Sequence, residues 1–325
     1  MNIVGRVVRK IRSYGWRMPK GSIDKNLSQL NRLKEEKCYL RAISVPESAS
    51  VKASFEEKRI IAHAYWYGEL GRKQIFSLKS FLATQNIDIV EVWLWLDSKN
   101  GFEHYSENEM LQMLLPYLAV KRYDPVSEIM HTPFAKCKEM MTQEHNLAAR
   151  ADAFRVLMMY KYGGLYFDLD VMFLRDFHQL FLGDEFVYAW ERQPFANSAL
   201  MYCRKGSYIT TSIVRKAIQK RSCLPWVLFR YDDRQMDYLM VYPCCFFDPL
   251  WMGVQEGMSI KSYSDLFCDK NELTSPKVVS FRDFFPGSYA FHWHNMWNSE
   301  IDDNSYFAQF ELEFDEIICQ LGERQ

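Results

Sequence analysis

Two aspartates with one residue between them, Asp168 and Asp170, are the side chains whose spacing points most directly to chemistry. They follow a short apolar run, residues 164–167, that is typical of a β-strand. Because side chains alternate along a strand, we expect both carboxylates to point to the same side and to converge on one cation. Carboxylate oxygens suit Mg²⁺ or Mn²⁺, and either ion would also hold a diphosphate.

A charged pair precedes these aspartates on a helix predicted over residues 144–162. Asp152 and Arg155 are three residues apart and therefore share one face of that helix. Taken alone, such a pair is most often a surface ion pair of little energetic weight, and an isolated Asp-x-Asp is most often a solvated loop. Here the acids are surrounded by core-forming residues, namely Met158, Met159, Val171, Met172, Phe173 and Leu174. Like charges in such surroundings repel unless a cation or donors compensate them. We therefore expect a metal and a nucleotide at the aspartates, and a substrate contact at Asp152 and Arg155.

These residues together match a longer pattern of about 20 positions: Ala151, Asp152, Arg155, Gly163, Gly164, Tyr166, Asp168 and Asp170. The pattern resembles the DXD region of metal-dependent, nucleotide-sugar glycosyltransferases with the GT-A fold. It is most similar to the DXD-containing sugar-transferase family (family 32-like), which groups bacterial capsule and lipopolysaccharide enzymes, yeast mannosyltransferases and, more distantly, clostridial glucosylating toxins. The resemblance implies an α/β fold, a Rossmann-like mixed sheet flanked by helices, here with an N-terminal helical extension.

The first 58 residues differ in composition from the rest. Residues 1–20 contain six bases, no acid and an apolar stripe at helical spacing, which is typical of a helix lying on an anionic membrane surface. An ordinary docked helix or a disordered basic tail is the alternative. Residues 21–58 are polar and predict a linker, so we place the catalytic domain at 59–325. Within it we expect a nucleotide-sugar half at 59–175 and an acceptor half at 176–325.

The predicted catalytic domain opens with a βαβ unit: a strand over residues 59–66, a helix over 71–85 and a strand over 87–96. This opening also resembles the family, in which the end of the first strand lines the uridine pocket. The resemblance makes Tyr65 and Trp66 candidates to stack on the base. Buried aromatic packing is the alternative for each ring.

The remaining elements are predicted from spacing. Helices are expected over residues 107–119, 207–220, 232–239 and 303–321, and strands over 120–123, 185–190 and 197–202, whereas 241–288 shows no clear period. Asn197 resembles the family's asparagine that follows the DXD, so it is a candidate to hydrogen-bond sugar hydroxyls. A turn-capping role is the alternative.

Two histidines alternate in residues 290–297, a segment that resembles the family's C-terminal return to the metal or diphosphate. On a strand, His292 and His294 would face the same way, and the register leaves open which one corresponds to the family position. We assign His294 to the metal with Asp168 and Asp170, and we assign His292, His294 and Trp297 to the nucleotide sugar.

Composition narrows the class of protein. Forty-one acids balance 40 bases, so no global field favours nucleic acid, and eight cysteines without metal-ligand spacing predict reduced, mostly buried thiols of a cytosolic protein. The sequence has no apolar run of 18 residues and no signal peptide. We expect a bacterial or viral enzyme of the cytoplasm, peripheral on the inner face of the plasma membrane if residues 1–20 bind lipid.

The expected activity is transfer of a sugar from a nucleoside diphosphate sugar, with a UDP-sugar favoured, to a hydroxyl of a glycan or glycolipid in surface polysaccharide synthesis. The resemblance implies catalytic residues Asp152, Arg155, Asp168 and Asp170, a Mn²⁺ or Mg²⁺ cofactor, and retention of configuration. Three alternatives stay open. The first is an effector that glycosylates a protein, and the second is a nucleotide-sugar-binding protein without activity. The third is a haloacid-dehalogenase-like phosphatase, although Met172 stands where that family has Thr or Val.

Overall fold

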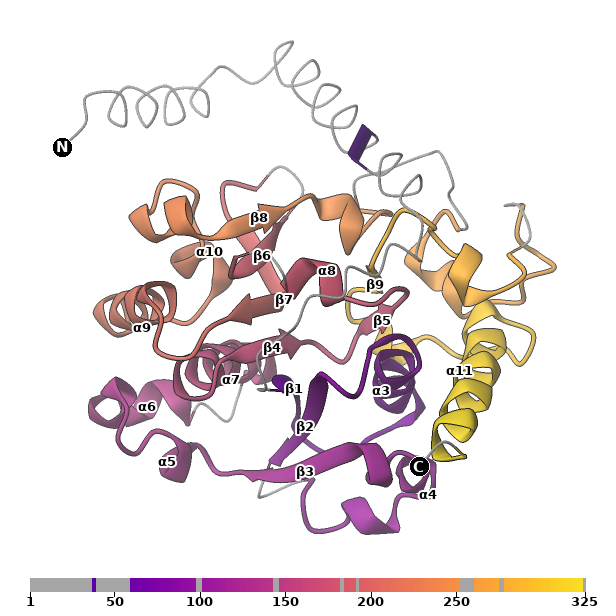
Figure 1. Cartoon of the computed structure of the whole chain (residues 1–325), viewed down its shortest axis with the longest axis horizontal. Helices are drawn as coiled ribbons and strands as arrows, with labels where there is room; N and C mark the ends of the chain where they lie inside the picture. The colour runs from indigo at the N-terminus through magenta and orange to yellow at the C-terminus, as the bar shows by residue number, and fades with distance from the viewer. Residues whose placement is uncertain are drawn as a thin grey trace.

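The computed structural model describes residues 37–38, 59–97, 101–142, 146–181, 184–190, 193–251, 260–274 and 278–323 (Figure 1). The basic helix expected over residues 1–20, and all but two residues of the expected linker, lie outside these residues. Within the described residues, no helix combines the length and the apolar character needed to cross a bilayer.

A seven-stranded sheet forms the centre of the fold, in the order β3-β2-β1-β4-β7-β6-β8. Its strands are β1 (Ile60–Trp66), β2 (Val90–Asp97), β3 (Leu118–Tyr123), β4 (Gly164–Phe167), β6 (Phe186–Ala189), β7 (Ala196–Cys203) and β8 (Met240–Tyr242). The four strands β1 to β4 run parallel, and β7 is antiparallel to both of its neighbours. A second, two-stranded sheet pairs β5 (Val171–Phe173) with β9 (Ala290–His292). The expected mixed α/β sheet is confirmed.

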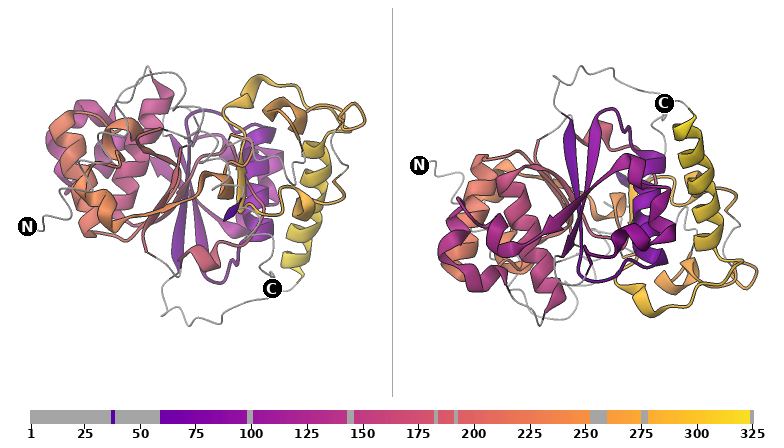
Figure 2. Two further views of the ribbon diagram at one scale, coloured as in Figure 1. Left: turned by 90° about the horizontal axis from the view of Figure 1, so that it is seen from above. Right: turned by 90° about the horizontal axis from the view of Figure 1, so that it is seen from below.

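Helices cover both faces of the large sheet (Figure 2). On one side lie α7 (Leu147–Lys161) and α9 (Tyr208–Lys220), and on the other lie α3 (Arg72–Thr84) and α11 (Tyr306–Gly322). The central strands are apolar along most of their length because both of their faces are buried. Short helices complete the chain: α4 (Glu109–Gln112), α5 (Pro125–Glu128), α6 (Lys138–Met141), α8 (His178–Phe181) and α10 (Pro225–Leu228).

The strand order creates a crevice between β1 and β4. From β1 the chain continues to β2 and β3 on one side, whereas β4 lies on the other side, so the connections diverge at this point. Ligands of open α/β sheets bind at the carboxyl ends of the strands where the order switches in this way. The ends of β1 and β4 are Trp66 and Phe167, and Asp168 follows directly.

Two glycines join α7 to β4 and fix how closely that strand approaches its neighbours. Both have positive φ values, 70° at Gly163 and 101° at Gly164, which side chains disfavour. A Cβ atom on Gly164 would lie 2.0 Å from the carbonyl oxygen of Ile61, and one on Gly163 would lie 2.4 Å from the backbone nitrogen of Lys205. The sequence therefore needs glycine at both positions for steric as well as conformational reasons.

Several predicted elements have different bounds in the structure. The helix expected over 107–119 is wrong: it is reduced to α4 and a 3₁₀ turn at Leu115–Tyr117, and β3 begins earlier than expected, at Leu118. Pro116 explains the break, because it lacks an amide hydrogen and clashes with the preceding turn of an α-helix. The helix expected over 232–239 is only a 3₁₀ helix, Arg234–Tyr238.

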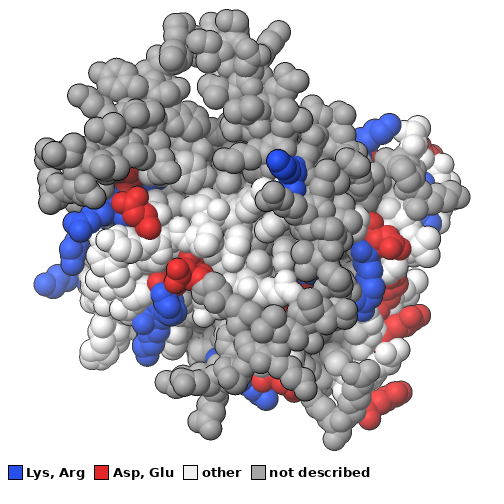
Figure 3. Space-filling view, turned by 45° about the horizontal axis from the view of Figure 1, so that its top comes forward, with Lys and Arg blue, Asp and Glu red and all other residues white. Residues whose placement is uncertain are grey.

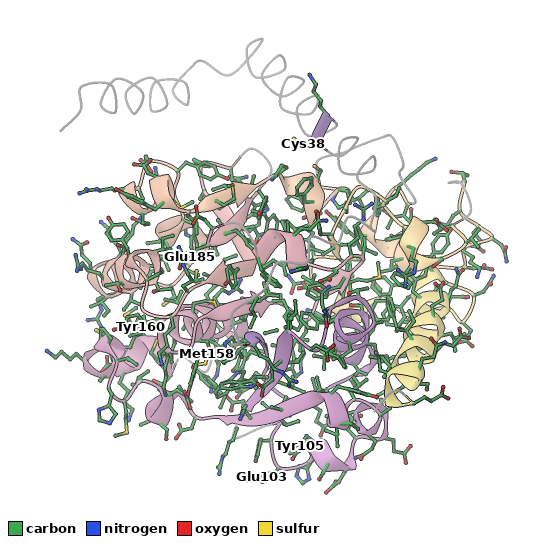
Figure 4. The ribbon with its side chains drawn as sticks, in the orientation of Figure 1. Cys38, Glu103, Tyr105, Met158, Tyr160 and Glu185 are labelled. Carbon is green, nitrogen blue, oxygen red and sulfur yellow. The ribbon has the colours of Figure 1, made fainter. Side chains whose placement is uncertain are left out.

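Side chains fill the layers on either side of the sheet (Figure 4). Met158 of α7 is fully buried, whereas Tyr160 is half-buried. Glu185, at the start of β6, accepts hydrogen bonds from the Arg204 backbone and the Ser207 hydroxyl beyond the end of β7. On the face shown in Figure 3, acidic and basic side chains of the described residues are interspersed rather than gathered by sign.

Candidate active site

The paired aspartates lie in a turn rather than on a strand. The Asp168 amide donates to the Ala199 carbonyl at 2.8 Å, and the Val171 amide donates to the Asp168 carbonyl at 3.2 Å. Strand alternation therefore does not explain their common direction, and that part of the sequence interpretation is wrong. The turn between β4 and β5 nevertheless brings both carboxylates to the same cavity.

Asp168 is held from the helix side of the crevice. Its Oδ1 is 3.2 Å from Arg155 Nη2 and also accepts from the Tyr166 hydroxyl. Burial raises the pKa of Asp168; Arg155 opposes this shift and the neighbouring Asp170 adds to it. The two like charges thus destabilise each other in the absence of a cation.

Asp170 is held from the C-terminal side. His292 Nε2 lies 3.2 Å from its Oδ1, and the Asn295 amide donates to its Oδ2 at 2.8 Å. Burial pushes the pKa of Asp170 upward, but the charge and hydrogen bond of His292 outweigh burial and lower it to about 2. Burial likewise lowers the pKa of His292, yet Asp170 raises it to about 9 overall.

Three donor atoms of this group are arranged as a metal would require. One ligand atom from each of Asp168, Asp170 and His292 lies within 4.8 Å of the others. The second ring nitrogen of His292 is 3.1 Å from the Tyr188 hydroxyl, and such a contact orients a metal-ligating imidazole. Two carboxylates with one imidazole fit a divalent cation such as Mn²⁺ or Mg²⁺.

His294 lies beyond the strand and beside a different acid. β9 ends at His292, and His294 and Asn295 have positive φ values of 48° and 58°, so the two histidines do not alternate on a strand as predicted. Their rings stack at 3.9 Å, and His294 Nε2 contacts Asp248 Oδ2. The structure therefore places His292, rather than His294, against Asp170. Asp248, His292 and His294 form a second group of possible ligands.

Asp248 is the acid that sequence reasoning missed. It is fully buried and also accepts from the Tyr263 hydroxyl at 3.0 Å. Its contact with His294 spans 46 residues of sequence, and it lies in the segment without a clear period. No local spacing signals such a partner.

The charged pair on α7 is buried at the cavity rather than solvated. Arg155 Nη2 lies 3.2 Å from Asp152 Oδ1, and Nη1 donates to the Ser198 hydroxyl at 3.1 Å. The guanidinium also lies over the Tyr166 ring, 4.7 Å from its centre. Burial raises the pKa of Asp152 to about 6, against the opposing effect of Arg155.

The two aromatic residues at the end of β1 differ in their surroundings. Tyr65 is buried, stacks on Phe154 at 4.5 Å and accepts a hydrogen bond from Arg150 Nε at 2.9 Å. Trp66 is half-buried, and its ring centre lies 5.0 Å from that of Trp297. Trp66 and Trp297 thus form an aromatic corner of the cavity, whereas Tyr65 is tied mainly into the core.

Asn197 lies near the start of β7 and is buried. Its Oδ1 accepts from the Ala199 amide at 2.9 Å, a local contact of the capping kind. Its Nδ2 has no partner among the described residues and can donate into the cavity that the residue lines.

One cavity of about 470 Å³ collects every residue singled out from the sequence. It is lined by Tyr65, Trp66, Asp152, Arg155, Asp168, Asp170, Asn197, His292, His294 and Trp297. It also includes residues that sequence reasoning did not select, among them Leu147, Trp190, Pro225 and Trp226.

Comparison with protein families identifies the class. Residues 77–187 match the family described as "Glycosyltransferase sugar-binding region containing DXD motif", and this region contains both Asp168 and Asp170. The protein is a DXD-containing glycosyltransferase. No curated protein sequence matches the chain.

Solved structures with a similar course of the chain include three glycosyltransferases. The PaToxG glycosyltransferase is 16% identical with a TM-score of 0.43, over 66% of this chain and 79% of that one. GlyE of Streptococcus pneumoniae TIGR4 is 12% identical with a TM-score of 0.43, over 82% of this chain and 64% of that one. Galactosyltransferase LgtC, in complex with donor and acceptor sugar analogues, is 11% identical with a TM-score of 0.42, over 80% and 96%. At these scores the similarities carry no argument about substrate.

Proposed function

We propose that the protein transfers a sugar from a nucleoside diphosphate sugar, with a UDP-sugar favoured, to a hydroxyl of a glycan or glycolipid. The observation that carries this proposal is the charge of the cavity. Three carboxyl groups, Asp152, Asp168 and Asp170, face one guanidinium and one protonated imidazole, and no lysine is among the described lining residues. A diphosphate would be repelled there unless a divalent cation accompanied it.

Asp168, Asp170 and His292 are the residues that would hold this cation. When bound, the ion supplies Lewis-acid stabilisation of the negative charge on the departing diphosphate. The carboxylates are prepared for this task, because the Tyr166 hydroxyl and the Asn295 amide already orient them.

The other residues bind and orient the donor. Arg155 is fixed by Asp152 and Ser198, so its remaining hydrogen-bond capacity is directed at sugar or phosphate oxygens. Trp66 and Trp297 offer ring surface for the base, and the Asn197 amide can donate to a sugar hydroxyl. In the reaction the bond between the sugar C1 and the diphosphate oxygen breaks, and the acceptor oxygen forms the new bond and loses its proton.

The finer assignments extend the same proposal. Retention of configuration, kinship with family 32-like enzymes, surface polysaccharide as the pathway, and a cytoplasmic site with residues 1–20 on an anionic membrane follow from the sequence resemblance and composition. Division into a nucleotide-sugar half, 59–175, and an acceptor half, 176–325, is part of it. His292 and Trp297 come from the second half, so both halves contribute to the proposed donor site. Glycosylation of a protein by an effector would use the same donor residues and remains the alternative.

The test is a panel of UDP- and GDP-sugars with Mn²⁺, read by thermal shift and by donor hydrolysis without acceptor. We expect one nucleotide class to raise the melting temperature only with metal, since ligand at about 100 times Kd stabilises by ~2.7 kcal/mol. Asp168→Asn should remove the metal-dependent shift, whereas Asp184→Asn, an exposed acid on a side chain 68% accessible, should not. A panel in which no nucleotide sugar binds with Mn²⁺ would refute the proposal.

A further inference from the structure

The cavity extends beyond the donor residues to an exposed aromatic rim. Trp226 in α10 is 47% exposed and Leu147 in the first turn of α7 is 51% exposed, and both line the cavity. Large apolar side chains left open at the mouth of a polar site are informative, because folding alone gives no reason to expose them.

The rim is rigidly attached to the site. The ring of Trp226 lies 6.5 Å from that of Phe195, which packs edge-on against Trp190 at 5.5 Å. The Ala196 amide donates to the Phe229 carbonyl at 3.0 Å, so the end of α10 is fastened to the start of β7. Three residues further along β7, Ala199 accepts the hydrogen bond of Asp168, about 10 Å away in an extended strand.

The aromatic surfaces of the cavity therefore form two separate groups, with elements of different origin. Trp66 and Trp297 come from the ends of β1 and β9, beside Asn295 and the Asp170 carboxylate. Trp190 and Trp226 come from β6 and α10, beside Asn197 at the start of β7. If the first group receives the base of the donor, the second is left for the other substrate.

The chemistry of the second group suits a sugar ring. A flat, preformed indole packs against the C–H face of a pyranose, while the hydroxyls at the ring edge remain free for polar neighbours such as the Asn197 amide. An acyl chain would not use that amide, and the described part of this rim offers only Leu147 and Pro225 as further apolar contacts.

We infer that Trp226, backed by Phe195 and Trp190, is the acceptor subsite, and that the acceptor is a saccharide whose terminal ring stacks on this indole. The inference rests on the proposed function. The stacked ring presents one hydroxyl to the donor sugar; its oxygen bonds to C1, the bond from C1 to the diphosphate breaks, and the hydroxyl proton passes to the leaving group or to solvent.

The experiment measures transfer and donor hydrolysis side by side, using the donor that the nucleotide-sugar panel selects. The probes are methyl glycosides of glucose, galactose and N-acetylglucosamine, and methyl lactoside. Trp226→Ala should lower the ratio of transfer to hydrolysis at least tenfold, mainly through a higher acceptor KM. Trp226→Phe keeps a ring and should stay within about threefold of the unchanged protein. Leu312→Ala, at a 66% exposed side chain on α11, should alter neither rate.

Binding of the same glycosides is followed by saturation-transfer-difference NMR with UDP and Mg²⁺, where Trp226→Ala should lose the signal. Equal acceptor KM in Trp226→Ala and the unchanged protein would overturn the inference. So would donor hydrolysis with neither transfer to nor NMR signal from any glycoside, or transfer only to a protein or a lipid alcohol. Absence of donor hydrolysis and of donor binding would instead refute the proposed function.

Discussion

Two arginines five residues apart on α7 are both buried beside aspartates, yet they belong to different environments. Arg150 contacts Asp97, which is fully buried, and donates to the Tyr65 hydroxyl inside the core. Arg155 contacts Asp152 and Asp168 and lines the cavity with them. Burial and pairing are common to both arginines, so access to the cavity is the property that distinguishes a ligand-binding pair from a structural one.

Two buried histidines show the same contrast. His63 bonds to the Gly163 carbonyl at 2.9 Å and accepts from Trp95 Nε1 at 3.0 Å, and burial lowers its pKa to about 4. His292 is buried too, but Asp170 beside it raises its pKa to about 9 against the effect of burial. The core keeps its histidine neutral, whereas the cavity keeps one charged next to carboxylates.

The largest expected effect lies on the cavity side of this comparison. Asp170→Asn should reduce transfer by about 10⁴-fold, or ~5 kcal/mol, because the residue would no longer hold the cation that stabilises the leaving group. Its melting temperature should change far less than its activity. The check is a steady-state assay with saturating Mn²⁺ together with thermal unfolding. Transfer within tenfold of normal would show that Asp170 is no metal ligand.

On the core side, Arg150→Met should lower the free energy of unfolding by about 3–5 kcal/mol, because the substitution leaves the Asp97 carboxylate buried without its partner. Urea unfolding measures this loss. Molecules that remain folded should bind the donor nucleotide as before. A stability equal to that of the unchanged protein would contradict the structural role, and weakened nucleotide binding by folded molecules would place Arg150 in the site.

His63 predicts a dependence of stability on pH. Its pKa is lowered from 6.5 in the unfolded chain to about 4 in the fold, so between these values the unfolded chain binds more protons. Its contribution is therefore complete above pH 6.5 and is lost as the pH falls towards 4, by up to ~3 kcal/mol.

The measurement compares urea unfolding at pH 7.5 and pH 5 for the unchanged protein and His63→Gln. The variant should show a smaller decrease between the two pH values. His104→Gln is the matched control, since the His104 side chain is 70% exposed, and it should keep the full decrease. Equal slopes for His63→Gln and the unchanged protein would mean that His63 is not held neutral.

The smallest effect is expected for Arg155→Lys, which keeps the charge but loses the planar fork of donors. Donor kcat/KM should fall by 10- to 100-fold, about 1–3 kcal/mol, with little change in melting temperature. Arg150→Lys is the paired control, and there stability should fall and donor kinetics should not. Unchanged donor kinetics in Arg155→Lys would make the two arginines alike, and the comparison would fail.

Much of the framework could be predicted because it depends on local periodicity. β1, α3, α7, α9 and α11 follow apolar patterns and caps that are visible in sequence. The gathering of the ten selected residues in one cavity follows from parallel strands whose carboxyl ends meet.

The remaining features depend on contacts between distant parts of the chain. Asp248 meets His294 across 46 residues, and Trp226 reaches the cavity only because the end of α10 pairs with the start of β7. The left-handed backbone at His294 and the turn at the paired aspartates also lack a signal, since both are imposed by surrounding packing. Pro116 was visible in the sequence, and its effect on the predicted helix was underweighted.

The Gly163-Gly164 junction has a consequence for how the site tolerates change in chain length. It leaves no spare residue between the helix that carries Arg155 and the strand that ends at Asp168, so it sets the rotational phase of one element against the other. One residue inserted there would turn α7 by about 100° relative to β4 and carry the guanidinium off the carboxylate. The thirteen-residue interval between Arg155 and Asp168 thus acts as a ruler, in which length is as strictly specified as side-chain chemistry.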